Sequence, residues 1–288
     1  MPKFALITDS TIDETADYFT QHDIGYAPLS FTIEGRTIDD DCGQTMPMHE
    51  FYDLLRQGKM PTTSQARPES FVALFRKALD AGLDVLYIGF SSGLSGTYQA
   101  GCIARDELAL QYPDRKILCI DSLSATGGEY LLVETARQMR DNGCTAEVAA
   151  AAVEQMRLHM IHLVAVSDLA HLHRGGRLSR TAAVVGSLLG IKPIVWVNDE
   201  GKLETGGKIR GLQNVIHYLA ERTIRELTDY SQTVRICHGD CLDAAEQLAA
   251  LLEKQGVKAD IRYIGTVIGA HTGPDTLVVC FLGGDRHA

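Results

Sequence analysis

Short apolar runs alternate with longer segments of helical periodicity along the chain. Phe4–Ile7, Val85–Gly89 and Ile117–Ile120 are each followed by a polar turn and then by a segment with apolar residues at helical spacing. Such alternation is typical of βαβ units, so the pattern predicts an α/β fold with mostly parallel sheets. Further strands are predicted in the second half, at Leu163–Val166, Ile194–Val197, Val234–Cys237 and Leu277–Leu282.

A helical pattern over Thr145–Met160 links the two halves of the chain. Ala149, Val153 and Met156 are spaced to form one buried face of this helix. The length of 288 residues is enough for two modest α/β domains. We therefore predict an N-terminal α/β domain over residues 1–160 and a C-terminal α/β domain over residues 161–288.

Three turns beside predicted strands are rich in hydroxyl groups. The first is Thr8–Thr11, where aspartate and serine can simply cap the next helix. The second is Pro61–Gln65, which precedes a helix that Pro68 begins. The third, Ser91–Tyr98, lies between a strand and a helix start, where free backbone N–H groups attract an anion.

The chemistry of these turns favours a carboxylate over a phosphate. No Lys or Arg occurs between Leu83 and Ala104, and neither a P-loop nor a dinucleotide-type glycine pattern is present. Hydroxyl and amide donors are sufficient for a singly charged carboxylate. The net charge of −10 argues against a general nucleic-acid-binding role, because a phosphate backbone attracts positive surface.

The second half holds an apolar segment and a basic one. Thr181–Val197 is rich in apolar residues and predicts either a buried helix or the lining of an acyl tunnel. Between His171 and Asn214, seven basic residues stand against three acidic ones. This excess fits a solvated face, a local anion site or a docking patch for an acidic partner.

Several other features narrow the functional classes. The chain has no run of 18 consecutive apolar residues, so no membrane span is predicted. Seven scattered cysteines predict reduced thiols and a cytoplasmic location. His171 and His173 lack a nearby carboxylate or cysteine, so no metal site is predicted. His271, set among glycines, is expected either in a cleft or packed in the core.

A serine hydrolase is the alternative function. Gly89–Gly93 matches the G-x-S-x-G pattern, and Ser91, Asp240 and His271 follow the chain order of an α/β-hydrolase triad. However, no HGGG-type oxyanion loop precedes the serine, and a second serine turn separates it from the next helix. This alternative therefore ranks below a binding protein.

The ordered set of motifs resembles the DegV family of fatty acid-binding proteins, the fatty-acid-carrier subunits of bacterial fatty acid kinases. The resemblance spans nearly the whole chain. Two positions depart from the usual pattern, with Ala66-Arg67 after the Thr-Ser-Gln motif and Asp275 after Gly-Pro. The matching motifs are Thr8–Thr11, Thr63–Gln65, Ser91–Gln99, Asp121-Ser122, Gly175–Ser179, Lys192-Pro193, Lys208–Gly211 and His271–Pro274.

This resemblance implies two α/β domains with a ligand tunnel between them. It implies a long-chain fatty acid whose carboxylate is held by Thr63 and Ser95, with His271 and Arg210 nearby, and no cofactor. Family members do not catalyse a reaction. A separate ATP-dependent fatty acid kinase phosphorylates the presented carboxylate, and the acyl phosphate enters phospholipid synthesis. We expect the kinase to dock on the basic stretch, at Arg174, Arg177, Lys208 and Arg210.

Overall fold

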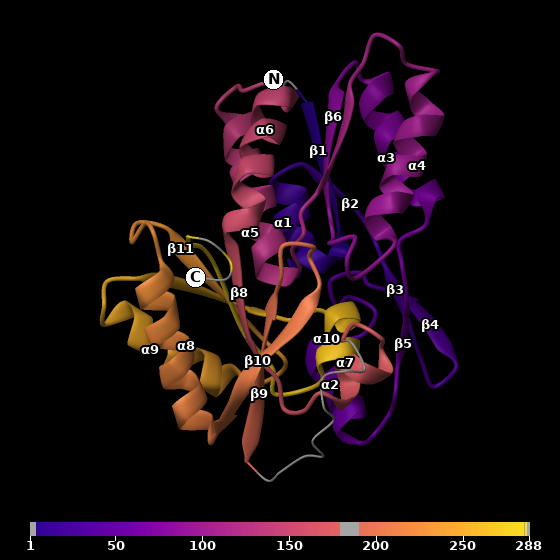
Figure 1. The fold of residues 1–288 in the computed structure, drawn as a ribbon. Coiled ribbons are helices and arrows are strands. Elements are labelled where there is room, and N and C mark those ends of the chain that lie inside the picture. Colours follow the sequence, from indigo (N-terminus) through magenta and orange to yellow (C-terminus); the bar gives the residue numbers. More distant parts are fainter. Residues whose placement is uncertain (1–3, 179–189, 285, 287–288) are drawn as a thin grey trace.

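The computed structural model describes residues 4–178, 190–284 and 286 of the chain (Figure 1). The first part forms a four-stranded sheet in the order β2-β1-β6-β7, and all its junctions are parallel. Its central strands are buried on both faces, which explains their nearly continuous apolar sequences. The strands are β1 (Phe4–Asp9), β2 (Ile24–Ala27), β6 (Asp84–Gly89) and β7 (Ile117–Asp121).

Helices cover both faces of this sheet. Figure 1 shows α3 and α4 on one side and α5 and α6 on the other. Phe71 and Phe75 of α3 pack in one core with Tyr87, while Leu132 of α5 and Val153 of α6 pack in a second core. The helices are α1 (Ala16–Gln21), α3 (Pro68–Asp80), α4 (Thr97–Ala109), α5 (Thr126–Asp141) and α6 (Ala146–Met156), with short 3-10 turns at Ser10–Ile12 and Arg157–His159.

The second part contains a six-stranded sheet in the order β10-β9-β8-β13-β11-β12. The α/β class is confirmed, but the prediction of mostly parallel pairing is wrong for this sheet. β11 and β12 are parallel, whereas the other four junctions are antiparallel. The strands are β8 (Met160–Ala165), β9 (Ile191–Val197), β10 (Leu203–Arg210), β11 (Thr233–His238), β12 (Lys258–Tyr263) and β13 (Leu277–Leu282).

Two connections explain the antiparallel pairing. A short turn joins β9 to β10, and a two-stranded hairpin is necessarily antiparallel. The last strand, β13, inserts between β8 and β11 and runs opposite to both. Helices α8 (Leu212–Glu226) and α9 (Leu242–Glu253) contribute Leu219 and Leu248 to the core of this part.

A small antiparallel sheet, in the order β4-β3-β5, connects the two parts. Phe31 of β3 and Phe51 of α2 share a core with Ala270 of α10, so residues near the start of the chain pack on residues near its end. Helix α7 also packs against α10. The elements are β3 (Ser30–Ile33), β4 (Arg36–Asp39), α2 (Met48–Arg56), β5 (Thr62–Ser64), α7 (Ala170–Arg174) and α10 (Thr266–Thr272).

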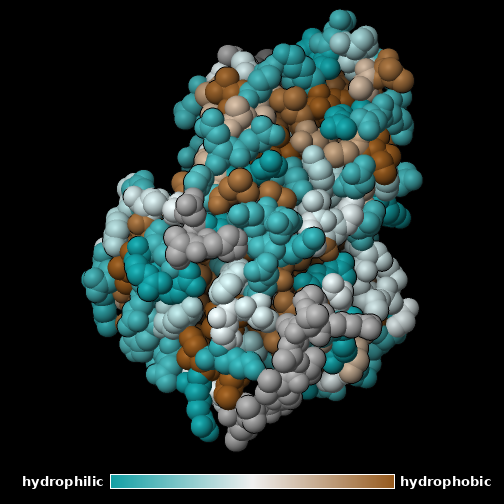
Figure 2. All heavy atoms as spheres, in the orientation of Figure 1, coloured by the Kyte–Doolittle hydropathy of each residue, from teal (hydrophilic) through white to brown (hydrophobic). Residues whose placement is uncertain are grey.

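The predicted linking helix is present but shorter than expected. It is α6, which ends at Met156, and β8 begins at Met160. The division at residue 160 remains a prediction, because α5 packs against strands of both larger sheets. Hydrophilic side chains cover most of the face in Figure 2. Within the described ranges, no helix is long and apolar enough to cross a membrane.

Candidate functional site

An apolar cavity lies where the two parts of the molecule meet. The space between its lining atoms, including its open mouth, is about 740 Å³. Both parts contribute to its walls, as expected for a tunnel between the two halves. Among its apolar lining residues are Phe90, Leu94, Val164, Leu172, Val197 and Val267.

Thr63 and His271 meet at one end of this cavity. Thr63 lies on β5 and His271 on α10, and the packing of α10 on the small sheet brings Thr63 Oγ1 to 2.8 Å from His271 Nε2. The His271 ring needs the glycine at position 175, because a Cβ there would lie 2.0 Å from Nδ1. Thr63 and His271 therefore connect β5 to the last turn of α10, and the His271 ring also packs against the turn after α7.

Ser95 lines the same cavity from the turn before α4. Its Oγ accepts the amide N–H of Thr97, the first residue of α4, at 3.2 Å, and it lies 2.9 Å from Thr97 Oγ1. That threonine hydroxyl in turn accepts the amide N–H of Ala66 at 3.3 Å. These bonds tie the segment after β5 to the serine turn, which holds two of the hydroxyl-rich motifs side by side.

Arg177 places a positive charge at this end of the cavity. Its side chain is half-buried and donates from Nε to the Leu94 carbonyl at 2.9 Å and from Nη1 to the Gly175 carbonyl at 2.6 Å. Burial and the neighbouring charge of Arg177 lower the pKa of His271 to about 4, so the His271 ring is neutral at pH 7. Arg177 thus braces its glycine turn and also lines the cavity.

A second, more polar depression adjoins the cavity. It has an empty volume of about 810 Å³ and shares Thr63, Arg177 and His271 with the cavity. His171 and Arg174 line it as well, and the charges of Arg174 and Arg177 give it a basic character. We call it the outer basic depression. The arrangement suits an amphiphile with an apolar tail and a single anionic head group, because polar donors gather where the cavity meets this depression.

Comparison with known proteins identifies the family. A family model described as an uncharacterised protein of the DegV family matches residues 3–283. The chain belongs to the DegV family. A DegV domain-containing protein of Clostridium perfringens is 40% identical over 286 residues, which cover 98% of each chain.

Solved structures of DegV proteins share the fold. One is described as showing fatty acid binding of a DegV family protein from Thermus thermophilus, with 29% identity, a TM-score of 0.86 and coverage of 99% of this chain and 100% of that chain. Another is described as a DegV lipid-binding protein from Thermotoga maritima, with 29% identity, a TM-score of 0.84 and coverage of 99% of each chain. The DegV assignment and the two-domain α/β architecture are therefore confirmed.

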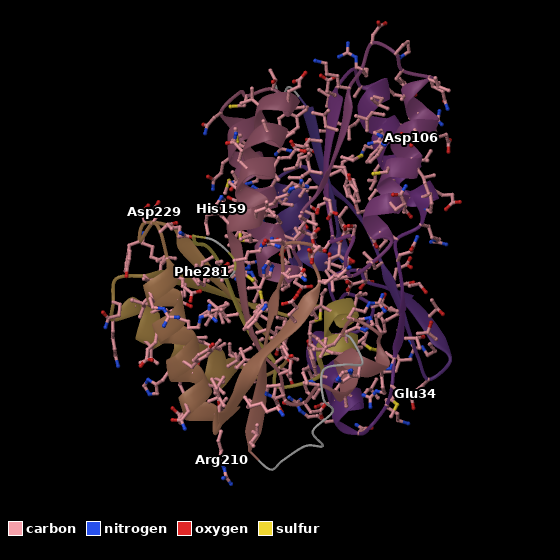
Figure 3. All side chains as sticks on the ribbon, in the orientation of Figure 1. Glu34, Asp106, His159, Arg210, Asp229 and Phe281 are labelled. Atoms are coloured by element: carbon pink, nitrogen blue, oxygen red, sulfur yellow. The ribbon has the colours of Figure 1, made fainter. Side chains whose placement is uncertain are left out.

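The structure brings together three of the four site residues that the DegV resemblance implied. Thr63, Ser95 and His271 line one cavity. Arg210 does not, because it ends the edge strand β10 and its exposed side chain points away from the molecule (Figure 3). The charge at the cavity comes instead from Arg177, which the sequence reasoning placed in the basic stretch. The sequence feature that could have identified Arg177 as a cavity residue is the Gly175-Gly176-Arg177 motif.

The geometry does not support the hydrolase alternative. The hydroxyl of Ser91 is buried and donates to the Gly201 carbonyl at 2.7 Å. Asp240 pairs with Arg56 and accepts a hydrogen bond from the Tyr263 hydroxyl at 3.1 Å. His271 is bonded to Thr63, so the three members of the supposed triad have separate partners.

The prediction for the apolar segment Thr181–Val197 is tested only in part. Of the apolar segment, Thr181–Leu189 lies outside the described residues, and Ile191–Val197 forms β9, with Val197 at the cavity wall. Among the described residues, no three His, Cys, Asp or Glu side chains are grouped to hold a metal ion.

Proposed function

We propose that this DegV protein binds one long-chain fatty acid. The tail occupies the apolar cavity, and the carboxylate lies at Thr63, Ser95 and His271, with Arg177 as the neutralising charge. The observation that carries the proposal is the Thr63–His271 pair at the point where the cavity meets the outer basic depression. Solved relatives described as fatty acid-binding proteins support the same ligand class.

The energetics of such a ligand match the site. Each methylene group that leaves water contributes about 0.8 kcal/mol, so a long tail supplies most of the affinity. A neutral His271 can donate from Nε2 to Thr63 Oγ1, which leaves the Thr63 hydroxyl free to donate to the carboxylate, and the Ser95 hydroxyl can donate a second hydrogen bond. The half-buried Arg177 then offsets the cost of burying the negative charge.

The protein would present the acid and leave the chemistry to a partner. We propose that a separate ATP-dependent fatty acid kinase phosphorylates the carboxylate through the outer basic depression, which is the side on which the head group lies. In this scheme the protein is a cytoplasmic carrier without a cofactor, and its acyl phosphate serves phospholipid synthesis. The free thiols of its seven cysteines suit a reducing compartment.

The ligand proposal is tested by native mass spectrometry of the protein isolated from cells. We expect about one acyl chain per protein chain, released as free fatty acid in an organic extract. Protein that carries no lipid, and that takes up no fatty acid after delipidation, would contradict the proposal.

The structure sharpens the expected docking surface for the kinase. Arg174 is exposed and lines the outer basic depression, whereas Lys208 and Arg210 lie on the edge strand β10. We therefore expect Arg174→Glu to slow acyl phosphate formation most at low salt, because rim charges act on association rates. Lys208→Glu is the matched control. Equal loss in both variants would extend the docking surface to β10, and no loss in Arg174→Glu would place it elsewhere.

A further inference from the structure

Gln65 places a carboxamide beside the residues that hold the head group in the proposed site. It follows β5 directly and lines the apolar cavity together with Thr63 and Ser95. Its side chain is exposed. The outer basic depression includes Thr63 but not Gln65, so Gln65 belongs to the cavity side of the head-group region.

Gly96 shows where this carboxamide lies. A Cβ at position 96 would be 2.1 Å from Gln65 Oε1, 3.0 Å from its Cδ and 3.5 Å from its Nε2, and these are the three nearest atoms outside the adjacent residues. The backbone at Gly96 has a φ of −77°, which any residue adopts. The glycine is therefore not required by the backbone conformation. It makes room for the carboxamide, which packs on the serine turn between Ser95 and Thr97.

The carboxamide of Gln65 is free to bind a ligand. Within the described part of the chain it makes no hydrogen bond. Its nitrogen lies farther from Gly96 than its oxygen does, and that nitrogen carries two N–H donors. A carboxylate accepts about four hydrogen bonds, of which the hydroxyls of Thr63 and Ser95 supply two. The guanidinium of Arg177 already donates to two backbone carbonyls, so a further donor is needed beside Ser95.

We propose that Gln65 donates a third hydrogen bond to the carboxylate of the fatty acid, and that Gly96 sets the position of its carboxamide. The inference rests on the proposed fatty acid binding and adds a residue to the head-group site. Gln65 is then a ligand-binding residue, whereas Gly96 is a positioning residue that acts through Gln65.

The first experiment is a calorimetric titration of the delipidated full chain with palmitic acid at about pH 8, where a free carboxyl group is ionised. We expect Gln65→Leu to bind roughly tenfold more weakly than the wild type, which is the effect of one lost hydrogen bond to a charged group. The free energy of unfolding of the ligand-free protein should not change, because the carboxamide makes no hydrogen bond there. Gln57→Leu is the matched control. Gln57 is exposed and lines neither the cavity nor the outer basic depression, so this variant should keep the wild-type affinity.

A charged variant separates a bond to the carboxylate from a general effect on the shape of the cavity. Gln65→Glu places a second carboxylate beside that of the ligand. We expect it to bind palmitic acid more weakly than Gln65→Leu does, and the difference between the two variants should shrink as salt is added. A residue that only shapes the cavity wall would respond alike to both substitutions.

The role of Gly96 is tested by Gly96→Ala. Alanine suits the backbone at this position, but its Cβ displaces the carboxamide. We expect Gly96→Ala to lose about as much affinity as Gln65→Leu, roughly tenfold. In the Gln65→Leu background, the same substitution should cause no further loss.

The outcomes are distinct. A wild-type protein that binds palmitic acid, together with a Gln65→Leu variant of equal affinity, would overturn the inference alone. So would equal affinities of Gln65→Leu and Gln65→Glu, or a loss from Gly96→Ala that persists undiminished in the Gln65→Leu background. A wild-type protein that does not bind palmitic acid would overturn the proposed function as well.

Discussion

The turn after β1 and the turns that carry Thr63 and Ser95 are all rich in hydroxyl groups, yet they have different roles in the structure. In the first turn, Asp9 accepts hydrogen bonds from the Thr11 amide at 3.2 Å, the Thr11 hydroxyl at 2.6 Å, the Phe90 amide at 2.9 Å and the Tyr87 hydroxyl at 3.2 Å. No part of this turn lines the cavity. Thr63 and Ser95, in contrast, have hydroxyls at the cavity wall.

The surroundings of the two regions explain this difference. Helix α5 covers the first turn, and Oε2 of Glu129, in the first turn of that helix, lies 2.7 Å from the Thr11 hydroxyl oxygen. Burial raises the pKa of Asp9 and of Glu129, as expected for carboxyls sealed from water. In the turn after β1, which a helix covers, the clustered hydroxyl groups form a closed structural network. In the turns of Thr63 and Ser95, which line the cavity, they form a candidate ligand site.

The largest effect is expected in the closed network. Asp9→Ala leaves several buried donors without an acceptor, and we expect it to lower the free energy of unfolding by about 3–5 kcal/mol. Urea denaturation measures this loss. The fraction that remains folded should bind fatty acid with nearly unchanged affinity. A loss below about 1 kcal/mol would show that the network contributes little to stability.

The next effect concerns the pH dependence of His271 in the ligand-free protein. Its pKa in the folded state is about 4 against an ordinary value of 6.5, because burial and Arg177 disfavour the charged ring. As the pH falls, His271 takes up a proton in the unfolded chain before it does so in the folded protein. The stability that this residue contributes above pH 6.5 is therefore lost as the pH falls toward 4. The contribution is about 3 kcal/mol.

The variant His271→Gln isolates this contribution. Its free energy of unfolding, measured by denaturation at a series of pH values, should fall less steeply over this window than that of the wild type. Identical slopes would mean that His271 is not shielded from water in the free protein.

The sequence predicted the large elements better than their arrangement. β1 and β6 are buried and apolar, and β7 is apolar and half-buried, so their pattern is clear. The small sheet was missed because β5 has 3 residues and two of them are exposed, which leaves no period to detect. The insertion of β13 between β8 and β11 depends on contacts between distant segments, and a local pattern does not encode it.

The same limit applies to the site residues, because a local sequence pattern does not encode contacts between distant segments. The DegV resemblance implied Thr63, Ser95 and His271 as site residues, and the three line one cavity. Arg177 was assigned to a surface patch, since its bond to the Leu94 carbonyl forms only when the serine turn and the glycine turn meet in the folded protein. Arg210 was placed at the site from resemblance, although it ends an exposed edge strand.

The smallest of these effects is expected in the open region. Thr63→Val removes one hydrogen bond to a charged group, which costs about 1.5–3 kcal/mol, or roughly ten- to a hundredfold in fatty acid affinity. Calorimetric titration measures it. The free energy of unfolding should fall by about 1 kcal/mol, because the variant also loses the hydrogen bond between Thr63 and His271. Thr32→Val, on the neighbouring strand and away from the cavity, is the matched control. If the affinity of Thr63→Val for fatty acid is unchanged, the carboxylate does not bind at Thr63.

A crystal structure of the complex with a long-chain fatty acid tests the central claim most directly. The account predicts one carboxylate oxygen at hydrogen-bonding distance from Thr63 Oγ1, about 2.5–3.0 Å, and the tail between Phe90 and Val164. It also predicts that the head group faces the outer basic depression beside Arg177. A fatty acid bound with its carboxylate inside the cavity but away from Thr63, or bound outside this cavity, would contradict this placement.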